Sequence, residues 1–193
     1  MTEADVVVLP FGGRRLPRSL RDLDTVSIDD ITAHRRVVVL GSDAELASVL
    51  TSLLRADRLD VEVCHVSRWW TAGRARSGVA TRVPLIRDET GTVIVGAAEW
   101  RGDPAGKELH GEAVVDDTVL FDGEVPGVRI EPTPTVPGLR AAVLGRGPRR
   151  WVAGRAAQLG TTGASVERDG LPAPRPVRRS TFYRHTEGWL RVR

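Results

Sequence analysis

The densest group of side chains that could do chemistry lies at the C-terminal end of the chain. Arg178, Arg179 and Arg184 are interleaved there with Phe182 and Tyr183. Guanidinium groups hold phosphates and aromatic rings stack on bases, so the three arginines are candidate anion-binding residues. The plainer interpretation is two edge strands with Phe182 facing inward and the arginines pairing with acids of the same chain. We prefer it and do not expect nucleic acid as the partner, although nucleic-acid binding is kept as an alternative.

A second patch combines Arg68 with Trp69 and Trp70, followed by Arg74 and Arg76. Exposed tryptophans beside arginine would suit a membrane surface or a partner protein. Buried tryptophans would instead belong to the core. The sequence leaves both interpretations open.

No metal site or nucleophile is expected. No two histidines have metal-ligand spacing, and a lone cysteine excludes both a disulfide and a cysteine-based metal site. Cys64 lies in an alternating run at 61–66, which is typical of a strand rather than of a nucleophile. Asp116-Asp117 could ligate a metal, but a solvated turn is the better interpretation. The histidines are His34, His65, His110 and His185.

The clearest elements lie in the N-terminal part. The apolar run Arg36–Leu40 predicts a strand buried on both faces, and leucines and valines at helical spacing predict a helix over 44–55. A second strand is predicted over 59–63, parallel to the first. Ser27, followed by acidic residues, predicts another helix that ends near His34.

The sequence changes character after a loop predicted over 67–82. Short apolar runs are then separated by turn signals such as Asp122-Gly123 and Asp169-Gly170, which is typical of an antiparallel sandwich or barrel. We therefore predict an α/β part with a short parallel sheet over 1–80. An antiparallel β-sandwich is predicted over 81–193.

Two stretches resemble the diacylglycerol kinase and NAD kinase superfamily. The first is 37–46, where family members have a buried strand, then Gly-Gly-Asp-Gly-Thr, then a helix. The second is an ordered series in the β-rich part: 120–123, 130–132, Gly138-Leu139, 154–159 and 166–170. The resemblance runs from about residue 35 to the C-terminus and implies a lipid-kinase-like fold, shortened at its N-terminus.

The nucleotide loop of the family survives here only as a remnant, Gly41-Ser42-Asp43. Ala44 and Glu45 replace the last glycine and the threonine. Ser42 and Glu45 instead have the spacing of a capping box, in which side chain and backbone satisfy each other at a helix start. A carboxylate then stands where a phosphate would bind, and two like charges at ~4 Å repel by about 4 kcal/mol near a protein surface.

Three further motifs of the family are also altered. The segment 135–140, where family lipid kinases carry aspartates for magnesium, has no carboxylate. The family's Asp-Gly-Glu is Asp169-Gly170-Leu171, which leaves Asp169 as a weak catalytic candidate and favours a simple turn. The Gly-Thr-x-Asn-Asp loop has no counterpart in 67–78.

These departures predict a degenerate, non-catalytic lipid-kinase-like protein that binds a partner protein or an anionic ligand. The alternative is an active lipid or nucleotide kinase that uses ATP and magnesium through rearranged residues. The acidic N-terminus and the lack of a long apolar stretch predict a cytoplasmic location. The net charge of +3 excludes neither function.

Overall fold

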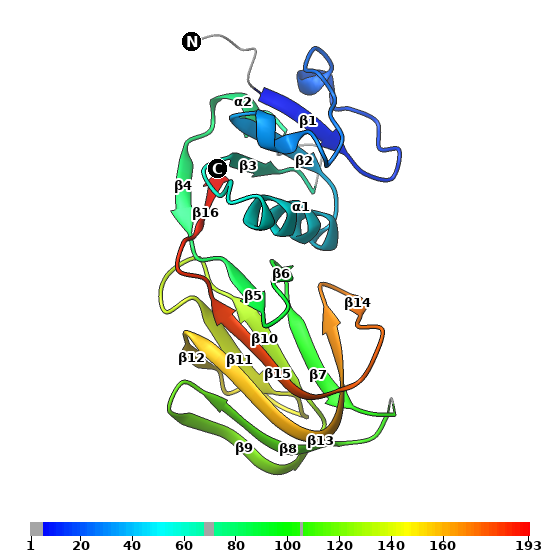
Figure 1. Ribbon diagram of the computed structural model, residues 1–193, viewed down its shortest axis with the longest axis vertical. Helices are drawn as coiled ribbons and strands as arrows, with labels where there is room; N and C mark the ends of the chain where they lie inside the picture. The colour runs from blue at the N-terminus through cyan, green and yellow to red at the C-terminus, as the bar shows by residue number, and fades with distance from the viewer. Residues whose placement is uncertain (1–5, 68–71, 105) are drawn as a thin grey trace. The chain divides into compact units, whose positions relative to one another are not determined.

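The computed structural model describes residues 6–67, 72–104 and 106–193, and they form two compact units (Figure 1). The first unit contains Met1–Val83 together with Glu187–Arg193, and the second contains Pro84–Thr186. The sequence-based boundary had assigned the last seven residues to the second part. They lie in the first unit because their strand pairs within its sheet.

The first unit is built on a five-stranded sheet of order β1-β2-β3-β16-β4. Its first four strands are parallel to their neighbours, and β4 runs antiparallel to β16. The predicted short parallel sheet is therefore confirmed. The strands are β1 (Val6–Pro10), β2 (Arg36–Leu40), β3 (Glu62–His65), β16 (Trp189–Val192) and β4 (Ala80–Val83).

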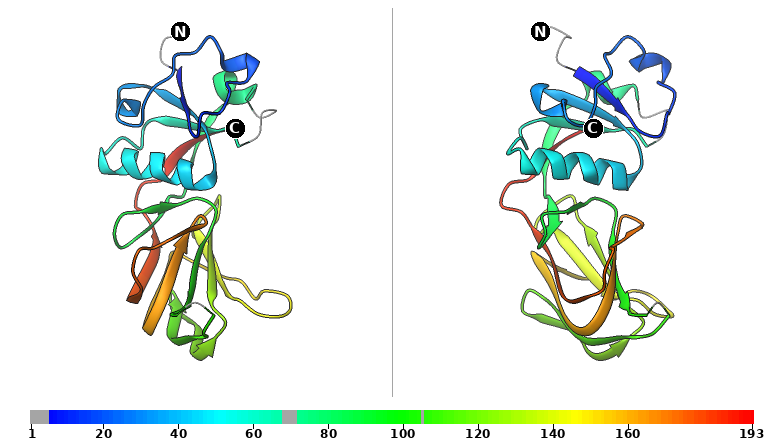
Figure 2. Two further views of the ribbon diagram at one scale, coloured as in Figure 1. Left: turned by 90° about the vertical axis from the view of Figure 1, so that its right-hand side faces the viewer. Right: turned by 45° about the vertical axis from the view of Figure 1, so that its right-hand side comes forward.

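The predicted strand–helix–strand unit is formed by β2, α1 (Asp43–Arg55) and β3. All five residues of β2 are buried, as the continuous apolar run requires. Figures 1 and 2 show α1 lying along one face of the sheet. Its buried side chains include Leu46, Val49, Leu50 and Leu53. The α/β part of the predicted fold class is thus confirmed.

Two local predictions in this unit were wrong. The segment after Ser27 is not an α-helix, since only a 3-10 turn forms over Ile31–Ala33 and the Ser27 hydroxyl donates to the Asp30 carboxylate at 2.7 Å. The predicted loop over 67–82 contains a short helix, α2 (Arg74–Ser77), and the start of β4. Both elements are too short to carry a periodic pattern, so tertiary contacts decide them.

The second unit is an antiparallel structure of eleven strands, which confirms the predicted sandwich. The order along the main path is β12-β11-β10-β7-β13-β15-β5-β6, while β8 pairs with β13 and β9. The strands are β5 (Ile86–Asp88), β6 (Val93–Ile94), β7 (Ala98–Gly102), β8 (Leu109–Val115), β9 (Thr118–Val125), β10 (Val128–Pro132), β11 (Leu139–Val143), β12 (Val152–Gly154), β13 (Ala156–Arg168), β14 (Leu171–Pro172) and β15 (Val177–Arg184).

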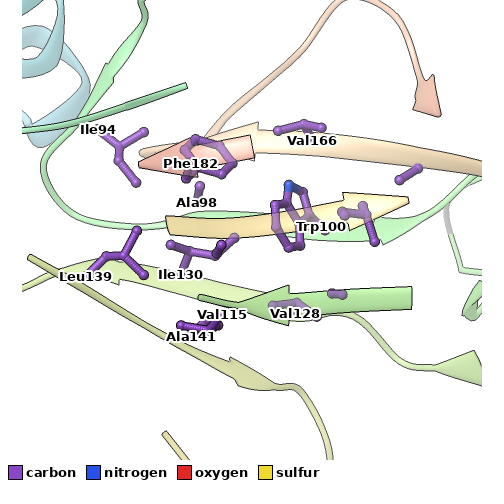
Figure 3. Packing of buried hydrophobic residues seen from close by; sticks show 14 of the residues in the cluster. Ile94, Ala98, Trp100, Val115, Val128, Ile130, Leu139, Ala141, Val166 and Phe182 are labelled. Carbon is purple, nitrogen blue, oxygen red and sulfur yellow. The ribbon is translucent and has the colours of Figure 1, made fainter. Parts of the chain in front are cut away.

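One long strand, β13, joins the two parts of this unit. Its first half pairs with β8 and its second half with β7, with an irregular stretch between Gly160 and Ala164. The core beneath it is centred on Trp100 and Phe182, whose ring centroids lie 5.9 Å apart (Figure 3). The buried indole of Trp100 donates to the Ser180 hydroxyl at 3.0 Å, so its polar nitrogen is satisfied.

None of the helices in the described residues is long and apolar enough to cross a membrane.

Candidate functional site

Loops from three parallel strands converge at the carboxyl end of the first unit's sheet. β1 leads to Gly12 and Gly13, both with positive φ, and then to Arg14. β2 leads to Gly41 and Ser42, and β3 ends at His65. Ligands of open α/β sheets bind at this edge, so the remnant Gly41-Ser42-Asp43 occupies the expected position for a nucleotide loop.

The capping box predicted from Ser42 and Glu45 is confirmed. One carboxylate oxygen of Glu45 accepts hydrogen bonds from the Ser42 backbone N–H at 2.6 Å and from the Ser42 hydroxyl at 2.9 Å. The Glu45 backbone N–H in turn donates to the Ser42 hydroxyl at 3.4 Å. Two of the backbone donors that a phosphate could use at this helix start, those of Ser42 and Glu45, are therefore engaged within the chain.

The Glu45 carboxylate fills the concave side of the loop. The same oxygen lies 2.7 Å from the position that a Cβ on Gly41 would take, and 3.8 Å from the Arg14 guanidinium. The Gly41 carbonyl contacts His65 Nε2 at 3.0 Å. An anion already occupies this loop, and it belongs to the chain, so the residues present do not fit nucleotide phosphates.

Asp43, the last residue of the remnant, remains accessible. Its side chain is 58% exposed, and its carboxylate lies 3.9 Å from His65 Nδ1. It is the one acid of the loop not folded into the capping box. A carboxylate in this position is compatible with an ordinary first helical turn, where acids are favoured.

Asp169 forms a turn, as the sequence favoured. It occupies a left-handed conformation with φ of +49° between β13 and β14. Its carboxylate accepts backbone N–H groups from Val95 at 3.0 Å, Gly96 at 2.7 Å and Ala97 at 2.9 Å. Three donors hold both oxygens against the backbone of another segment, an arrangement that stabilises structure and leaves little freedom for proton abstraction.

The segment that carries magnesium ligands in lipid kinases has a structural role here. The Gly138 carbonyl accepts from the Thr133 backbone N–H at 2.8 Å, and Arg140 forms an ion pair with Glu131 at 2.6 Å. In residues 6–67, 72–104 and 106–193, no group of three His, Cys, Asp or Glu side chains is placed to hold a metal ion. The segment 135–140 has no carboxylate, so it does not provide the magnesium ligands that the resemblance implies for this segment.

The three candidate anion-binding arginines do not form one site. Alternation along β15 places Arg179 on one face of the strand, and Arg178 and Arg184 on the face of buried Phe182. Arg179 lines a shallow hollow together with the carboxylate-bearing Glu112. The Arg184 stem packs against Gly138. These residues were grouped in the sequence because they lie close together in the chain. In a strand, however, consecutive side chains point to opposite faces.

The remaining candidates have plain explanations. Cys64 is buried in β3, where burial raises the pKa of its thiol and keeps it protonated, although Arg36 and Arg191 act in the opposite direction. Asp116-Asp117 forms a turn between β8 and β9. The Asp116 carboxylate accepts hydrogen bonds from the backbone N–H groups of Arg155 at 2.9 Å and Ala156 at 3.0 Å. The patch around Trp69 and Trp70 lies outside the described residues.

A ladder of charges across β7, β10 and β11 was not found from the sequence. Arg129 binds Glu99 and Glu131, both at 2.8 Å, and Glu131 also binds Arg140 at 2.6 Å. Glu99 lies opposite Arg129 in the sheet, and Glu131 lies opposite Arg140. In the sequence, Glu99 and Arg101, and Arg129 and Glu131, are each two residues apart, which only weakly indicates pairing. The register of the strands is needed to reveal the ladder.

The ladder predicts a loss of stability in acid. Burial alone would raise the pKa of Glu99 and Glu131, but hydrogen bonds from Arg129, Arg101 and Arg140 outweigh it and hold both pKa values below the ordinary 4.5. Folding therefore gains stability from both groups above pH 4.5, and this gain disappears as the pH falls through the lower folded-state values.

We expect urea unfolding of Glu99→Gln and Glu131→Gln to depend less steeply on pH below 4.5 than unfolding of the wild type. Glu124→Gln, at an exposed position of β9, should retain the wild-type slope. Equal slopes in all four proteins would show that the ladder does not couple folding to protonation.

Comparison with known proteins identifies the fold. No family model and no curated protein matches the chain. Among solved structures, a putative diacylglycerol kinase from Bacillus anthracis str. Sterne is 9% identical with a TM-score of 0.74, over 98% of this chain and 96% of that chain. An NAD kinase from Archaeoglobus fulgidus, solved in complex with ATP, is 12% identical with a TM-score of 0.67, over 97% and 93% of the two chains.

The chain therefore has the fold of diacylglycerol kinases and NAD kinases, as its sequence resemblance predicted. A second diacylglycerol kinase structure from Bacillus anthracis str. Sterne gives a TM-score of 0.71 at 10% identity, with 98% and 96% coverage. At these identities the comparison establishes the fold alone. The predicted N-terminal shortening stays a prediction.

Proposed function

We propose that this protein is a non-catalytic, lipid-kinase-like protein that binds a partner protein or an anionic ligand. One observation carries the proposal. The Glu45 carboxylate accepts a hydrogen bond from the Ser42 backbone N–H at 2.6 Å, in the loop where a kinase would bind phosphate. The Gly41-Ser42-Asp43 remnant forms the self-capped start of α1, which supports the proposal.

Nucleotide binding would have to displace this carboxylate or tolerate it. At ~4 Å its repulsion of a phosphate is about 4 kcal/mol near a surface, roughly half of the binding free energy of a micromolar ligand. The Arg14 guanidinium, 3.8 Å from Glu45, compensates the chain's own charge rather than a ligand's. Two further observations support the loss of catalysis: Asp169 is held by three backbone donors, and Leu171 stands where the family has a glutamate.

Thermal unfolding with and without ATP and magnesium tests the proposal. We expect no change in the wild-type midpoint, because the loop is closed by its own carboxylate. Glu45→Thr removes that carboxylate and restores the residue type of the family, so its midpoint should rise when ATP and magnesium are added. Each protein is compared with itself, because losing the cap lowers the stability of the variant before any ligand is added.

Glu124→Thr, on β9 of the second unit, is the matched control and should behave as the wild type. Ligand at about 100 times its dissociation constant adds about 2.7 kcal/mol of stability, which moves a midpoint by several degrees. A rise of that size in the wild type would refute the proposal. Unchanged midpoints in both proteins would show that Glu45 is not what closes the loop.

The second candidate is an active ATP- and magnesium-dependent lipid or nucleotide kinase. The exposed Asp43 carboxylate at the start of α1 favours it, because it is accessible to a metal ion. This candidate requires Asp43 and Asp169 to share metal and base roles. Magnesium-dependent transfer of phosphate from ATP, abolished in Asp43→Asn with unchanged stability, would establish it.

The other predicted partners remain proposals. Trp69 and Trp70 would contact a membrane surface, and the protein would act in the cytoplasm. Nucleic-acid binding through Arg178, Arg179 and Arg184 receives no support from their placement on opposite faces of β15. If it occurs, affinity should fall steeply as salt is raised.

A further inference from the structure

A hollow in the second unit combines unopposed positive charge with an apolar floor. It has a volume of about 400 Å³ and lies beside the loop that joins β11 to β12. Arg146, Arg149 and Arg150 come from that loop, whereas Val119 and Leu120 come from β9 and Val152 from β12. No aspartate or glutamate is among the residues that line it.

The arginines of this loop differ from those of the charge ladder in having no carboxylate partner among the residues that the structure describes. In the charge ladder, Arg129 and Arg140 are each paired with a carboxylate. Arg146, Arg149 and Arg150 form no salt bridge with any residue in the described part of the chain. Three guanidinium groups within five residues repel one another, so an anion between them would be stabilised by charge-assisted hydrogen bonds.

Trp151 helps to place the arginines at the base of the loop. The Arg149 guanidinium carbon lies 5.9 Å from the centroid of its ring, and that of Arg140 lies 4.2 Å away. Arg140 is itself fixed by Glu131. The ring therefore connects the loop to the rigid ladder, which lowers the entropy lost when an anion binds.

The floor of the hollow is apolar and partly open to solvent. Val119 is 59% exposed, unusually high for a valine in a strand, and Leu120 and Val152 are half-buried beside it. The volume is within the range of small-molecule sites, which pair an apolar lining with a few orienting polar groups. A purely polar anion would leave these apolar side chains exposed to water, so a ligand with an apolar part fits the hollow better.

We propose that this hollow binds an amphiphilic anion, a phosphate or similar head group attached to an apolar chain. The head group is held by Arg146, Arg149 and Arg150, and the chain covers Val119, Leu120 and Val152. The inference rests on the proposed binding function and names its ligand class and place. All of the lining residues lie in the second unit, so the site is separate from the Gly41-Ser42-Asp43 remnant.

Calorimetric titration with dodecyl phosphate, below the concentration at which it forms micelles, tests the site. We expect the wild type to bind it, and Arg146→Gln and Arg149→Gln each to weaken binding by about tenfold, since a hydrogen bond to a charged group contributes roughly that factor. Val119→Ser should weaken it several-fold by removing apolar contact. Arg178→Gln, an exposed arginine on β15, is the matched control and should bind as the wild type.

Inorganic phosphate tests the head group alone and should bind much more weakly than dodecyl phosphate. Sedimentation with phosphatidylcholine vesicles, with and without phosphatidate, distinguishes the source. Binding to monomeric dodecyl phosphate would identify the ligand as a free amphiphile. Binding to phosphatidate vesicles, without binding to the monomer, would identify it as a membrane lipid. Either result supports the proposal. Binding to neither, equal affinity for inorganic phosphate, or affinity unchanged in Arg146→Gln and Arg149→Gln would overturn it.

The thermal-unfolding and binding experiments can fail independently of each other. A midpoint raised by ATP and magnesium in the wild type would refute the non-catalytic assignment and leave the hollow intact. Failure of dodecyl phosphate and of the vesicles to bind would remove the hollow and leave the self-capped loop as it is. Arg146 and Arg149 lie at exposed positions of the loop between β11 and β12, Val119 is exposed on β9 and Arg178 is exposed on β15. Unchanged urea midpoints confirm that all four variants fold.

Discussion

Asp169→Gly should destabilise the second unit by about 3 kcal/mol or more, because it removes a carboxylate that satisfies three backbone donors. The N–H groups of Val95, Gly96 and Ala97 would lose their partner in a partly buried position. Glycine adopts the φ of +49° found at Asp169 without strain, so this variant isolates the loss of the hydrogen bonds. Urea unfolding measures the effect.

Two further variants separate the contributions. Asp169→Ala adds the cost of a left-handed conformation, about 1–2 kcal/mol, to the lost hydrogen bonds. Asp169→Asn retains one acceptor and tolerates the conformation, so it should lose less than the glycine variant. Asp122→Gly, at an exposed position of β9, controls for the general effect of a new glycine in the same unit.

The outcome bears directly on function. If Asp169 were a catalytic base, the wild type would have a measurable activity, and Asp169→Asn would abolish it while the folded protein persists. A large loss of stability in Asp169→Gly and Asp169→Ala, a smaller loss in Asp169→Asn, and no activity in the wild type would support the structural role. Stability equal to the wild type in Asp169→Gly would contradict it.

The parts of the site that the sequence predicted are those formed by residues close together in the chain. Ser42 and Glu45 are three residues apart, so helix geometry alone fixes their contact. The turn at Asp169-Gly170 follows from the dipeptide itself. The strand β2 and helix α1 followed from apolar periodicity, because one is buried on both faces and the other along one stripe.

The parts that the sequence did not predict depend on pairs far apart in the chain. The partners of Asp169 lie more than seventy positions away, at 95–97. The hollow beside Arg146 requires β9 and β12 to lie near the same loop. The placement of β16 in the first unit is a further case, since nothing in residues 187–193 indicates pairing with β3.

Arg36 is the strongest example of a residue whose role only the structure reveals. It begins β2, and its side chain is only 7% exposed. The guanidinium donates to the Glu62 carboxylate at 2.6 Å and to the carbonyls of Ala75 at 3.1 Å, Arg76 at 2.6 Å and Gly78 at 3.0 Å. One buried cation therefore connects β2 to β3 and to the segment around α2.

Arg36→Met should lower the free energy of unfolding by about 3–5 kcal/mol, the cost of removing one partner from a buried ion pair. The three carbonyls lose their donor, and methionine fills the volume without replacing the charge. Arg35→Met is the matched control: its neighbouring guanidinium contacts the same Glu62 oxygen at 2.9 Å, but its side chain is 45% exposed. Exposed pairs contribute at most about 1 kcal/mol.

A double-mutant cycle with Glu62→Gln tests whether the pair or the carbonyl contacts dominate. If the ion pair dominates, the double variant should be less destabilised than the sum of the two single variants. Once one partner of the pair is absent, removing the other has no pair left to break. If the carbonyls dominate, the two effects should add, since Glu62→Gln leaves the bonds to 75–78 intact. A loss below about 1 kcal/mol in Arg36→Met, equal to that in Arg35→Met, would show that burial gives this arginine no special role.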